Sequence, residues 1–220
     1  ISLMPLMERA LRPSAVLTDV SSVKSSVARA ARSSLEGKFS RFVPGHPVAG
    51  SEQSGACAAK ADLFHNHWVI LSPLADTDED AVDLVTDMWA AAGARTRLME
   101  ESLHDQVLGM ISHLPHVVAY ALMPLLDTQT ARDDCMTLAA GGFYDISRIA
   151  SSDPVMWRDI LLHNGPVVRD LIAKYRDTLG ELDRLIESGD GRRLESWFAN
   201  ARELRSAIQE LRPPAKRDSK

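Results

Sequence analysis

Two different patterns meet near residue 99 of this sequence, and they constrain the fold more than any other feature. Before that point, short β-branched and apolar runs alternate with helical patterns, as is typical of a parallel α/β sheet. After it, no strand pattern recurs and long helical patterns follow. We therefore predict an α/β domain over residues 1–99 and an all-helical domain over residues 100–220, with a disordered polar tail at 213–220.

The predicted elements follow one another closely. We expect strands at 15–20, 41–43, 67–74 and 94–99, and helices at 1–11, 23–35, 78–92, 101–126, 130–140, 154–163, 165–188 and 191–211. Ser21 or Ser22 is expected to cap the helix at 23–35, and Gly93 to end the helix at 78–92. Parallel sheets bind ligands outside the carboxyl ends of their strands, which here are residues 19–22 and 44–47.

Charge and composition narrow the class of partner. The net charge of −5 argues against nucleic acid, which requires a basic surface. Residues 1–75 hold eight Lys/Arg against five Asp/Glu, so an anionic ligand is favoured in this first part. No apolar run comes near the ~20 residues that cross a bilayer. Cys57 and Cys135 are too few for a disulfide framework or a zinc site, so we expect reduced thiols in a cytoplasmic protein.

The sequence begins at Ile1, inside a helical pattern, and we expect further residues upstream.

The loop at 44–55, PGHPVAGSEQSG, places His46 between a glycine and a proline directly after a strand. Histidine titrates near neutrality and therefore suits general-base chemistry. The alternative is a plain surface loop in which the histidine is incidental.

The segment at 19–24, DVSSVK, places hydroxyls and backbone N–H groups at a helix N-terminus, which suits an anion or a polar ligand. Ordinary N-capping by Ser21 or Ser22 explains the same pattern and is the simpler reading.

The segment at 104–116, HDQVLGMISHLPH, places His113 and His116 on one helix face, with Pro115 expected to bend the helix. A third metal ligand at a familiar spacing is lacking, so we predict no metal site. Partly buried, hydrogen-bonded histidines are the alternative to a pair that faces a ligand.

The segment at 139–159 carries Arg148 after a helix break at Gly141 and Gly142. A guanidinium group matches the two oxygens of a carboxylate, whereas a salt bridge to Asp145 is the structural alternative. Asp153 or Ser152 is expected to cap the next helix.

Two apolar stripes mark the last long helices. Leu171, Tyr175, Leu179, Leu182 and Ile186 share one face, and Trp197, Ala201, Leu204, Ile208 and Leu211 form a heptad-like series. Such stripes indicate a hairpin packed on its own domain or a dimer interface.

Taken together and in this order, these motifs resemble the prephenate/arogenate (cyclohexadienyl) dehydrogenases. The matching pieces are DVSSVK, GHPVAGSEQSG, ADLF…WVILSP, HD…SHLPH and GGFYDISRIASSDPVMWRD. The resemblance implies the C-terminal part of a Rossmann-like dinucleotide-binding domain followed by a helical dimerisation domain. It also implies NAD- or NADP-dependent oxidative decarboxylation of prephenate or arogenate in tyrosine biosynthesis, by a homodimer. The glycine-rich fingerprint of the family would lie before the segment where this sequence begins.

The resemblance carries roles to matching positions of this sequence. His46 corresponds to the base and Ser22 to the serine that hydrogen-bonds the substrate hydroxyl, while Ser21, Ser22 and Pro47 lie toward the cofactor. The substrate-binding positions are Ser112, His113, His116, Arg148 and Trp157, and the acidic gating positions are Glu52 and Asp145.

Two other functions compete with this interpretation. One is a catalytically inactive ligand-binding or dimerisation module that keeps the substrate pocket. The other is a dehydrogenase with the same two-domain plan that acts on 3-hydroxy acids, against which the pairing of GHP with SHLPH argues.

Overall fold

The computed structural model describes residues 1–50, 55, 57 and 59–211. It divides into two compact units, Ile1–Leu171 and Ile172–Lys220. The first unit holds all the strands of the described chain together with the helices that surround them, and it contains both cavities considered below. The division of the sequence into domains at residue 99 stays a prediction.

The strands are short and form two small sheets. They are β1 (Leu17–Thr18), β2 (Phe42–Val43), β3 (Gly45–Pro47), β4 (Trp68–Leu71) and β5 (Arg95–Leu98). Strands β1 and β2 are parallel, as are β4 and β5, whereas β3 runs antiparallel to β4 with His46 opposite Ile70. All four predicted strands are present in shortened form.

The expectation of a wholly parallel sheet is therefore wrong at Gly45–Pro47, which was predicted as a loop. His46 precedes a proline, and that position favours extended backbone. Pro47 is tolerated because β3 lies at the edge of its sheet, where a missing N–H costs little. The GHP motif is thus held on a strand rather than in a loop.

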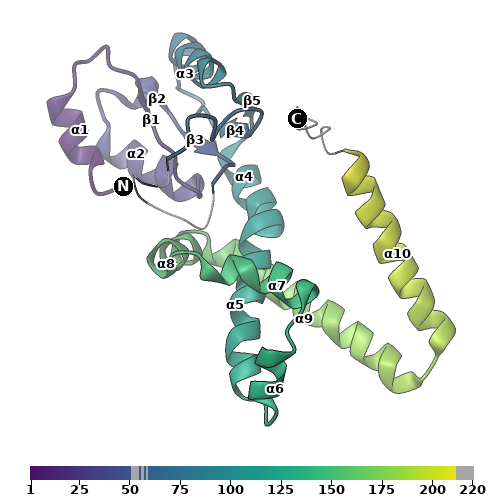
Figure 1. The fold of residues 1–220 in the computed structure, drawn as a ribbon. Helices are drawn as coiled ribbons and strands as arrows, with labels where there is room; N and C mark the ends of the chain where they lie inside the picture. The colour runs from purple at the N-terminus through teal and green to yellow at the C-terminus, as the bar shows by residue number, and fades with distance from the viewer. Residues whose placement is uncertain (51–54, 56, 58, 212–220) are drawn as a thin grey trace, which may run out of the picture. The chain divides into compact units, whose positions relative to one another are not determined.

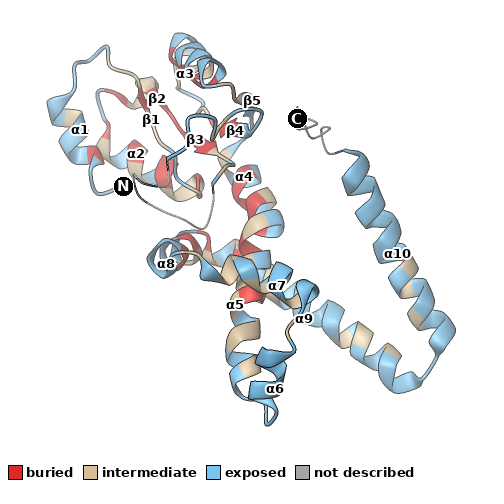
Figure 2. Cartoon of the chain, in the orientation of Figure 1, coloured by how far each residue is buried: buried red, intermediate tan, exposed pale blue. Residues whose placement is uncertain are grey.

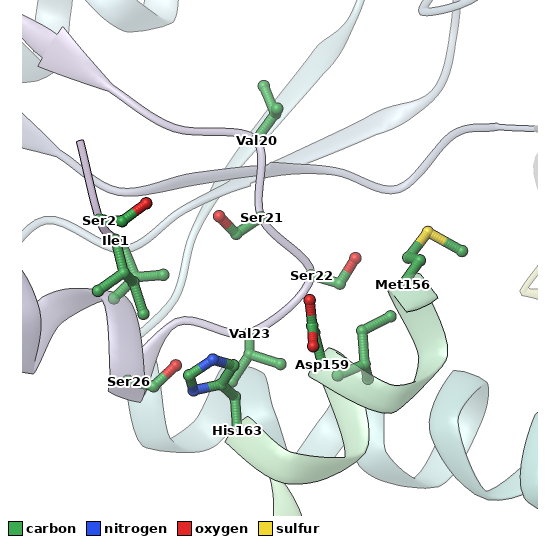
Figure 3. A pocket seen from close by; sticks show the side chains of 12 residues that line it. Ile1, Ser2, Val20, Ser21, Ser22, Val23, Ser26, Met156, Asp159 and His163 are labelled. Carbon is green, nitrogen blue, oxygen red and sulfur yellow. The ribbon is translucent and has the colours of Figure 1, made fainter. Parts of the chain in front are cut away.

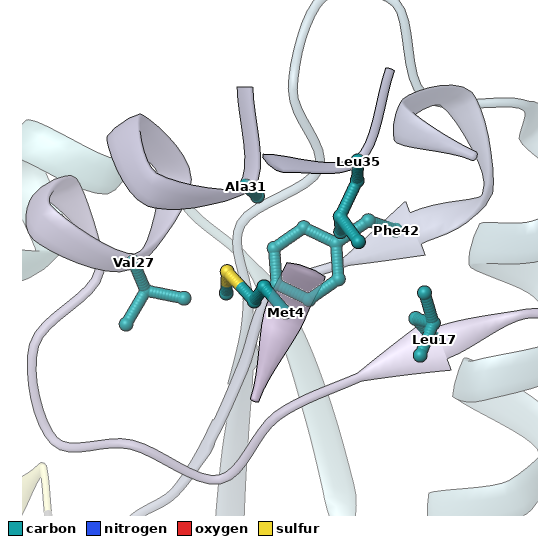
Figure 4. Packing of buried hydrophobic residues seen from close by; sticks show 6 residues of the cluster. All are labelled: Met4, Leu17, Val27, Ala31, Leu35 and Phe42. Carbon is teal, nitrogen blue, oxygen red and sulfur yellow. The ribbon is translucent and has the colours of Figure 1, made fainter. Parts of the chain in front are cut away.

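Helices on either side of the strands bury two apolar clusters (Figure 1). Helices α1 (Met4–Ala10) and α2 (Ser25–Ser34) contribute to the cluster drawn in Figure 4, which consists of Met4, Leu17, Val27, Ala31, Leu35 and Phe42. Helix α3 (Glu79–Ala91) packs Ala81, Val85 and Trp89 against Val69 and Leu71 of β4. Gly93, with φ of 79°, ends the turn after α3 as predicted.

One continuous helical segment follows, made of α4 (Glu101–Leu108), a π-helical turn (Gly109–His113) and α5 (Leu114–Asp127). Pro115 has no N–H for the helical ladder, and the π turn directly before it absorbs the mismatch without ending the helix. By length and composition this segment could span a membrane, a criterion that we expected no segment to meet. One such helix is weak evidence for a membrane span, and His104, Asp105 and His113 within it are buried polar residues.

The remaining helices are a 3₁₀ turn (Phe39–Arg41), α6 (Arg132–Thr137), α7 (Gly141–Ser147), a 3₁₀ turn (Arg148–Ser151), α8 (Pro154–His163), α9 (Gly165–Ser188) and α10 (Gly191–Glu210). The predicted break at Gly141 and Gly142 is where α7 begins, a helix that the sequence analysis missed. Asp153 caps α8 by accepting a hydrogen bond from the Met156 amide, as predicted.

The second unit is a hairpin of the end of α9 and α10, joined at Gly189, whose φ is 64°. Asp190 caps α10 by accepting a hydrogen bond from the Arg193 amide. The apolar stripes of both helices are largely exposed in the single chain, as the pale α10 in Figure 2 shows. The exposed members are Tyr175, Leu179, Ile186, Ala201, Leu204, Ile208 and Leu211.

Gly109, in the π turn, packs closely against helix α9. A Cβ atom there would lie 2.8 Å from Val167 Cγ1 and 3.1 Å from Leu171 Cδ1. We expect Gly109→Ala to lower the free energy of unfolding by about 1–3 kcal/mol, because the added methyl overpacks this contact. Denaturant unfolding measures the change. Gly180→Ala is the matched control in α9, where only the flexible end of Arg184 is near, and it should be neutral or stabilising. Equal effects of the two substitutions would contradict the close packing.

Candidate active site

A cavity of about 400 Å³ lies between the GHP strand and the helices that follow. It brings together residues that are far apart in the sequence: His46 from β3, Ser112 and His116 from the π turn and α5, and Arg148 from the start of a 3₁₀ turn. The other lining residues are Pro47, Val48, Ala49, Gly50, His67, Leu108, Ile149, Ser152 and Met156. None of these described residues is acidic, so the wall suits an anionic ligand.

His46 is held by its strand and by the residue before it. Gly45 donates its N–H to Asp19 Oδ1 at 3.0 Å, and its carbonyl accepts a hydrogen bond from Lys24 Nζ at 2.5 Å. An added Cβ at Gly45 would lie 2.9 Å from the Asp19 carbonyl oxygen, so only glycine fits this approach. The backbone that presents His46 is therefore fixed on both sides of the strand.

Lys24 is fully buried and pairs with Asp19, whose Oδ2 lies 2.6 Å from Lys24 Nζ. Burial lowers the pKa of Lys24, against the opposing effect of Asp19. Lys24 does not line this cavity, so its charge supports the GHP strand rather than contacting a ligand directly.

A chain of buried hydrogen bonds runs from His46 into helix α4. His46 Nδ1 lies 2.8 Å from His104 Nε2, and His104 Nδ1 lies 2.8 Å from Asp105 Oδ1. The Asp105 carboxylate also accepts the backbone N–H groups of Lys24 and Ser25 at 2.8 and 2.9 Å. The first turn of α2 is thus capped by a carboxylate from a distant helix.

The predicted capping of this helix by Ser21 or Ser22 is wrong. The helix begins at Ser25, two residues later than expected, and Asp105 occupies the position of a capping side chain. The serine hydroxyls are consequently left for other partners.

Burial sets the protonation of this site. It lowers the pKa of His46 to about 3, with His104, Lys24 and His113 acting in the same direction and Asp105 opposing them. Burial opposes ionisation of Asp105, but hydrogen bonds from His104, Lys24 and Ser25 outweigh it and lower the pKa of that carboxyl. At neutral pH His46 is therefore an uncharged imidazole and Asp105 a carboxylate.

The two histidines of SHLPH take different positions. His116 lines the cavity, has its Nδ1 2.9 Å from the Ser112 carbonyl oxygen, and stacks on Trp157 with ring centroids 3.8 Å apart. His113 is buried behind it, with its Nδ1 3.0 Å from Asn164 Nδ2, and burial lowers its pKa to about 4. Among the described residues, neither His113 nor Trp157 lines the cavity, so both support its wall from behind.

A second cavity of about 620 Å³ adjoins the first, because Met156 lines both. Figure 3 shows Ser21, Ser22 and Ser26 around it, together with Asp159 and His163 from α8. The Ser26 hydroxyl is buried and has no protein hydrogen-bond partner in the structure. A ligand with polar groups would satisfy it.

The other predicted site residues do not gather at one cavity. Ser22 lines the second cavity and Pro47 the first, so the two do not share a wall. Asp145 is exposed on α7, three residues before Arg148, and Glu52 lies outside the described residues.

The sequence analysis missed several residues that line or support the two cavities. His67, for which the sequence analysis predicts no role, lines the first cavity, while Ser26 and Met156 line the second. The His104–Asp105 pair was visible as the HD that precedes SHLPH, but spacing alone did not connect it with His46.

Residues 2–98 match the family described as "Prephenate dehydrogenase, nucleotide-binding domain", and residues 100–200 match "Prephenate dehydrogenase, dimerization domain". A cyclohexadienyl dehydrogenase from Zymomonas mobilis is 36% identical over 94% of this chain and 72% of that protein. This chain belongs to the prephenate dehydrogenase family. The predicted family and fold class, a nucleotide-binding domain followed by a helical dimerisation domain, are therefore confirmed.

Two further relatives support the assignment to the prephenate dehydrogenase family. A prephenate dehydrogenase from Bacillus subtilis is 38% identical over 88% of this chain and 52% of its own length. A crystal structure of prephenate dehydrogenase from A. aeolicus, in complex with hydroxyphenyl propionate and NAD+, superposes with a TM-score of 0.87 at 36% identity, covering 94% of this chain and 72% of that one.

Proposed function

We propose that this chain carries the active site of an NAD(P)-dependent dehydrogenase that oxidatively decarboxylates prephenate or arogenate. The observation that carries the proposal is the pairing of two cavities at Met156. One holds an uncharged histidine and an arginine, and the other holds serine hydroxyls at the start of α2. The relatives of this chain named prephenate and cyclohexadienyl dehydrogenase support the same substrate class.

In this proposal His46 accepts the proton of the substrate ring hydroxyl. Its low pKa keeps the imidazole uncharged, with a lone pair available for that proton. The nicotinamide cofactor, when bound, would supply the acceptor for the hydride that leaves the carbon bearing the hydroxyl. Loss of the ring carboxylate as carbon dioxide leaves its electron pair in the ring, which becomes aromatic. His46 then returns the proton to the resulting phenolate oxygen, so it ends the cycle uncharged.

Substrate binding falls to the polar groups of the first cavity. Arg148 would pair with a carboxylate through two parallel N–H···O bonds, and Ser112 would donate a hydrogen bond. His116 directs its Nδ1–H to the Ser112 carbonyl oxygen, so its Nε2 would accept a hydrogen bond from the substrate. His113 and Trp157 would keep the His116 ring in position. Glu52 and Asp145 remain proposals for residues that pair with Arg148 at the entrance.

The second cavity suits the nicotinamide end of the cofactor. The unpartnered Ser26 hydroxyl supplies a donor and an acceptor there, and Ser21 and Ser22 add two more hydroxyls. We place Ser22 closest to the reacting hydroxyl, because it matches by motif the serine that hydrogen-bonds this hydroxyl, and it lines the cavity that adjoins the substrate cavity. Pro47 would contribute from the substrate side.

The exposed stripes of α9 and α10 support a homodimer formed through the helical part. The family description of residues 100–200 as a dimerization domain agrees with this. We further propose a cytoplasmic enzyme of tyrosine biosynthesis, with functional domains at 1–99 and 100–220.

The assay follows formation of the reduced nicotinamide in the natural full-length protein that carries this sequence. Prephenate and arogenate are each offered with NAD and with NADP, and a 3-hydroxy acid serves as the comparison substrate. Turnover of prephenate or arogenate is the expected result. Binding of prephenate without turnover would contradict the proposal and indicate the inactive binding module, and turnover of the 3-hydroxy acid alone would contradict the substrate class.

Arg148→Lys tests the carboxylate contact. A lysine keeps the positive charge but cannot donate two parallel N–H···O hydrogen bonds to one carboxylate. We therefore expect KM for prephenate to rise about 10-fold with little change in kcat. Steady-state kinetics give both values. Arg132→Lys is the matched control, because Arg132 is exposed on α6 and pairs with Asp127. An unchanged KM in Arg148→Lys would reduce Arg148 to a structural role.

A further inference from the structure

The hydrogen bonds that connect His46 with Asp105 have a direction. Asp105 is a carboxylate and can only accept, so His104 Nδ1, at 2.8 Å from Asp105 Oδ1, must carry a proton. Two backbone N–H groups at the start of α2 fix the same carboxylate, which excludes a rotation that would release His104. His104 is fully buried, so no solvent competes for this contact.

The protonation of His104 determines which ring nitrogen of His46 carries the proton. If Nδ1 carries the only proton of the His104 ring, then Nε2 has a lone pair, and this nitrogen lies 2.8 Å from His46 Nδ1. That lone pair can only accept, so the proton of His46 is on Nδ1. An uncharged imidazole carries one proton, and the Nε2 of His46 is then the nitrogen with the free lone pair.

We propose that His104, oriented by Asp105, is a positioning residue that holds the proton of His46 on Nδ1 and thereby keeps His46 Nε2 as the acceptor for the substrate hydroxyl. The inference rests on the proposed role of His46 as the base. Without His104, His46 would populate both tautomers, and the one protonated on Nε2 cannot accept the hydroxyl proton. Among the described residues that line the two cavities, His104 does not occur, so it acts through His46 alone.

Two substitutions separate the hydrogen bond from the packing. His104→Leu fills the space without an acceptor, whereas the amide oxygen of His104→Gln can still accept from His46 Nδ1. We expect kcat to fall about 10- to 100-fold in His104→Leu and to recover partly in His104→Gln, with KM within about twofold of the parent in both. His65→Leu is the matched control, because His65 is exposed and outside both cavities.

The tautomer is measured directly by ¹⁵N NMR of the imidazole nitrogens at neutral pH, assigned to His46 by its loss in His46→Asn. We expect a protonated Nδ1 and an unprotonated Nε2 in the parent and in His104→Gln, and a mixture in His104→Leu. A parent protein with the proton on Nε2 would overturn the proposal, even if the leucine variant fails to fold. An unchanged kcat in His104→Leu would also overturn it.

The same assay separates a failure of the positioning role of His104 from a failure of the proposed base. If His46→Asn lowers kcat but His104→Leu does not, only the positioning role of His104 is lost. If His46→Asn keeps the parent kcat, the proposed base is wrong and the role of His104 falls with it.

Discussion

Replacing His46 with asparagine is expected to lower kcat by about 10²- to 10⁴-fold, the range that a positioned general base contributes. Asparagine keeps a polar side chain of similar reach, but its amide does not take up a proton near neutral pH. KM should change little, because Arg148, Ser112 and His116 hold the substrate from other walls of the cavity. Steady-state kinetics with prephenate and the preferred nicotinamide cofactor measure both constants.

His65→Asn is the control for this substitution, since it makes the same chemical change at an exposed position. A parent-like kcat in His46→Asn would remove His46 as the base. A large rise in KM with an unchanged kcat would instead assign it to substrate binding.

Replacing Lys24 with methionine is expected to lower the free energy of unfolding by about 3–5 kcal/mol, because it leaves a largely buried Asp19 without its cation. The side chain of Lys24 is fully buried, and Asp19 is only 16% exposed. The substitution also removes the hydrogen bond to the Gly45 carbonyl. For a chain of this length the loss corresponds to a Tm lower by about 10 °C.

Thermal and denaturant unfolding measure this change, with Lys60→Met as the control at an exposed position. The double variant Lys24→Met/Asp19→Asn should recover part of the stability, because it no longer buries an unpaired charge. If Lys24→Met is as stable as the control, the ion pair does not hold the GHP strand.

Some of the fold could be predicted because its signals are local. The change from strand–helix alternation to helices near residue 99, Gly93 after α3 and Asp153 at the start of α8 all depend on neighbouring residues. The antiparallel direction of β3 could not be predicted, because it depends on pairing with β4 more than twenty residues later. The same reason explains the wrong cap of α2, which Asp105 supplies from eighty residues away.

The sequence by itself determined the family, the two-part fold class and the residue types that suit the chemistry, since these follow from motifs in order along the chain. Only the tertiary structure decided which of those residues share a wall. It places His46, Ser112, His116 and Arg148 on one cavity, and His113 and Trp157 behind it. It also decided the buried chain of contacts from His46 to His104 and from His104 to Asp105, because burial and long-range hydrogen bonds arise from packing that local sequence patterns do not encode.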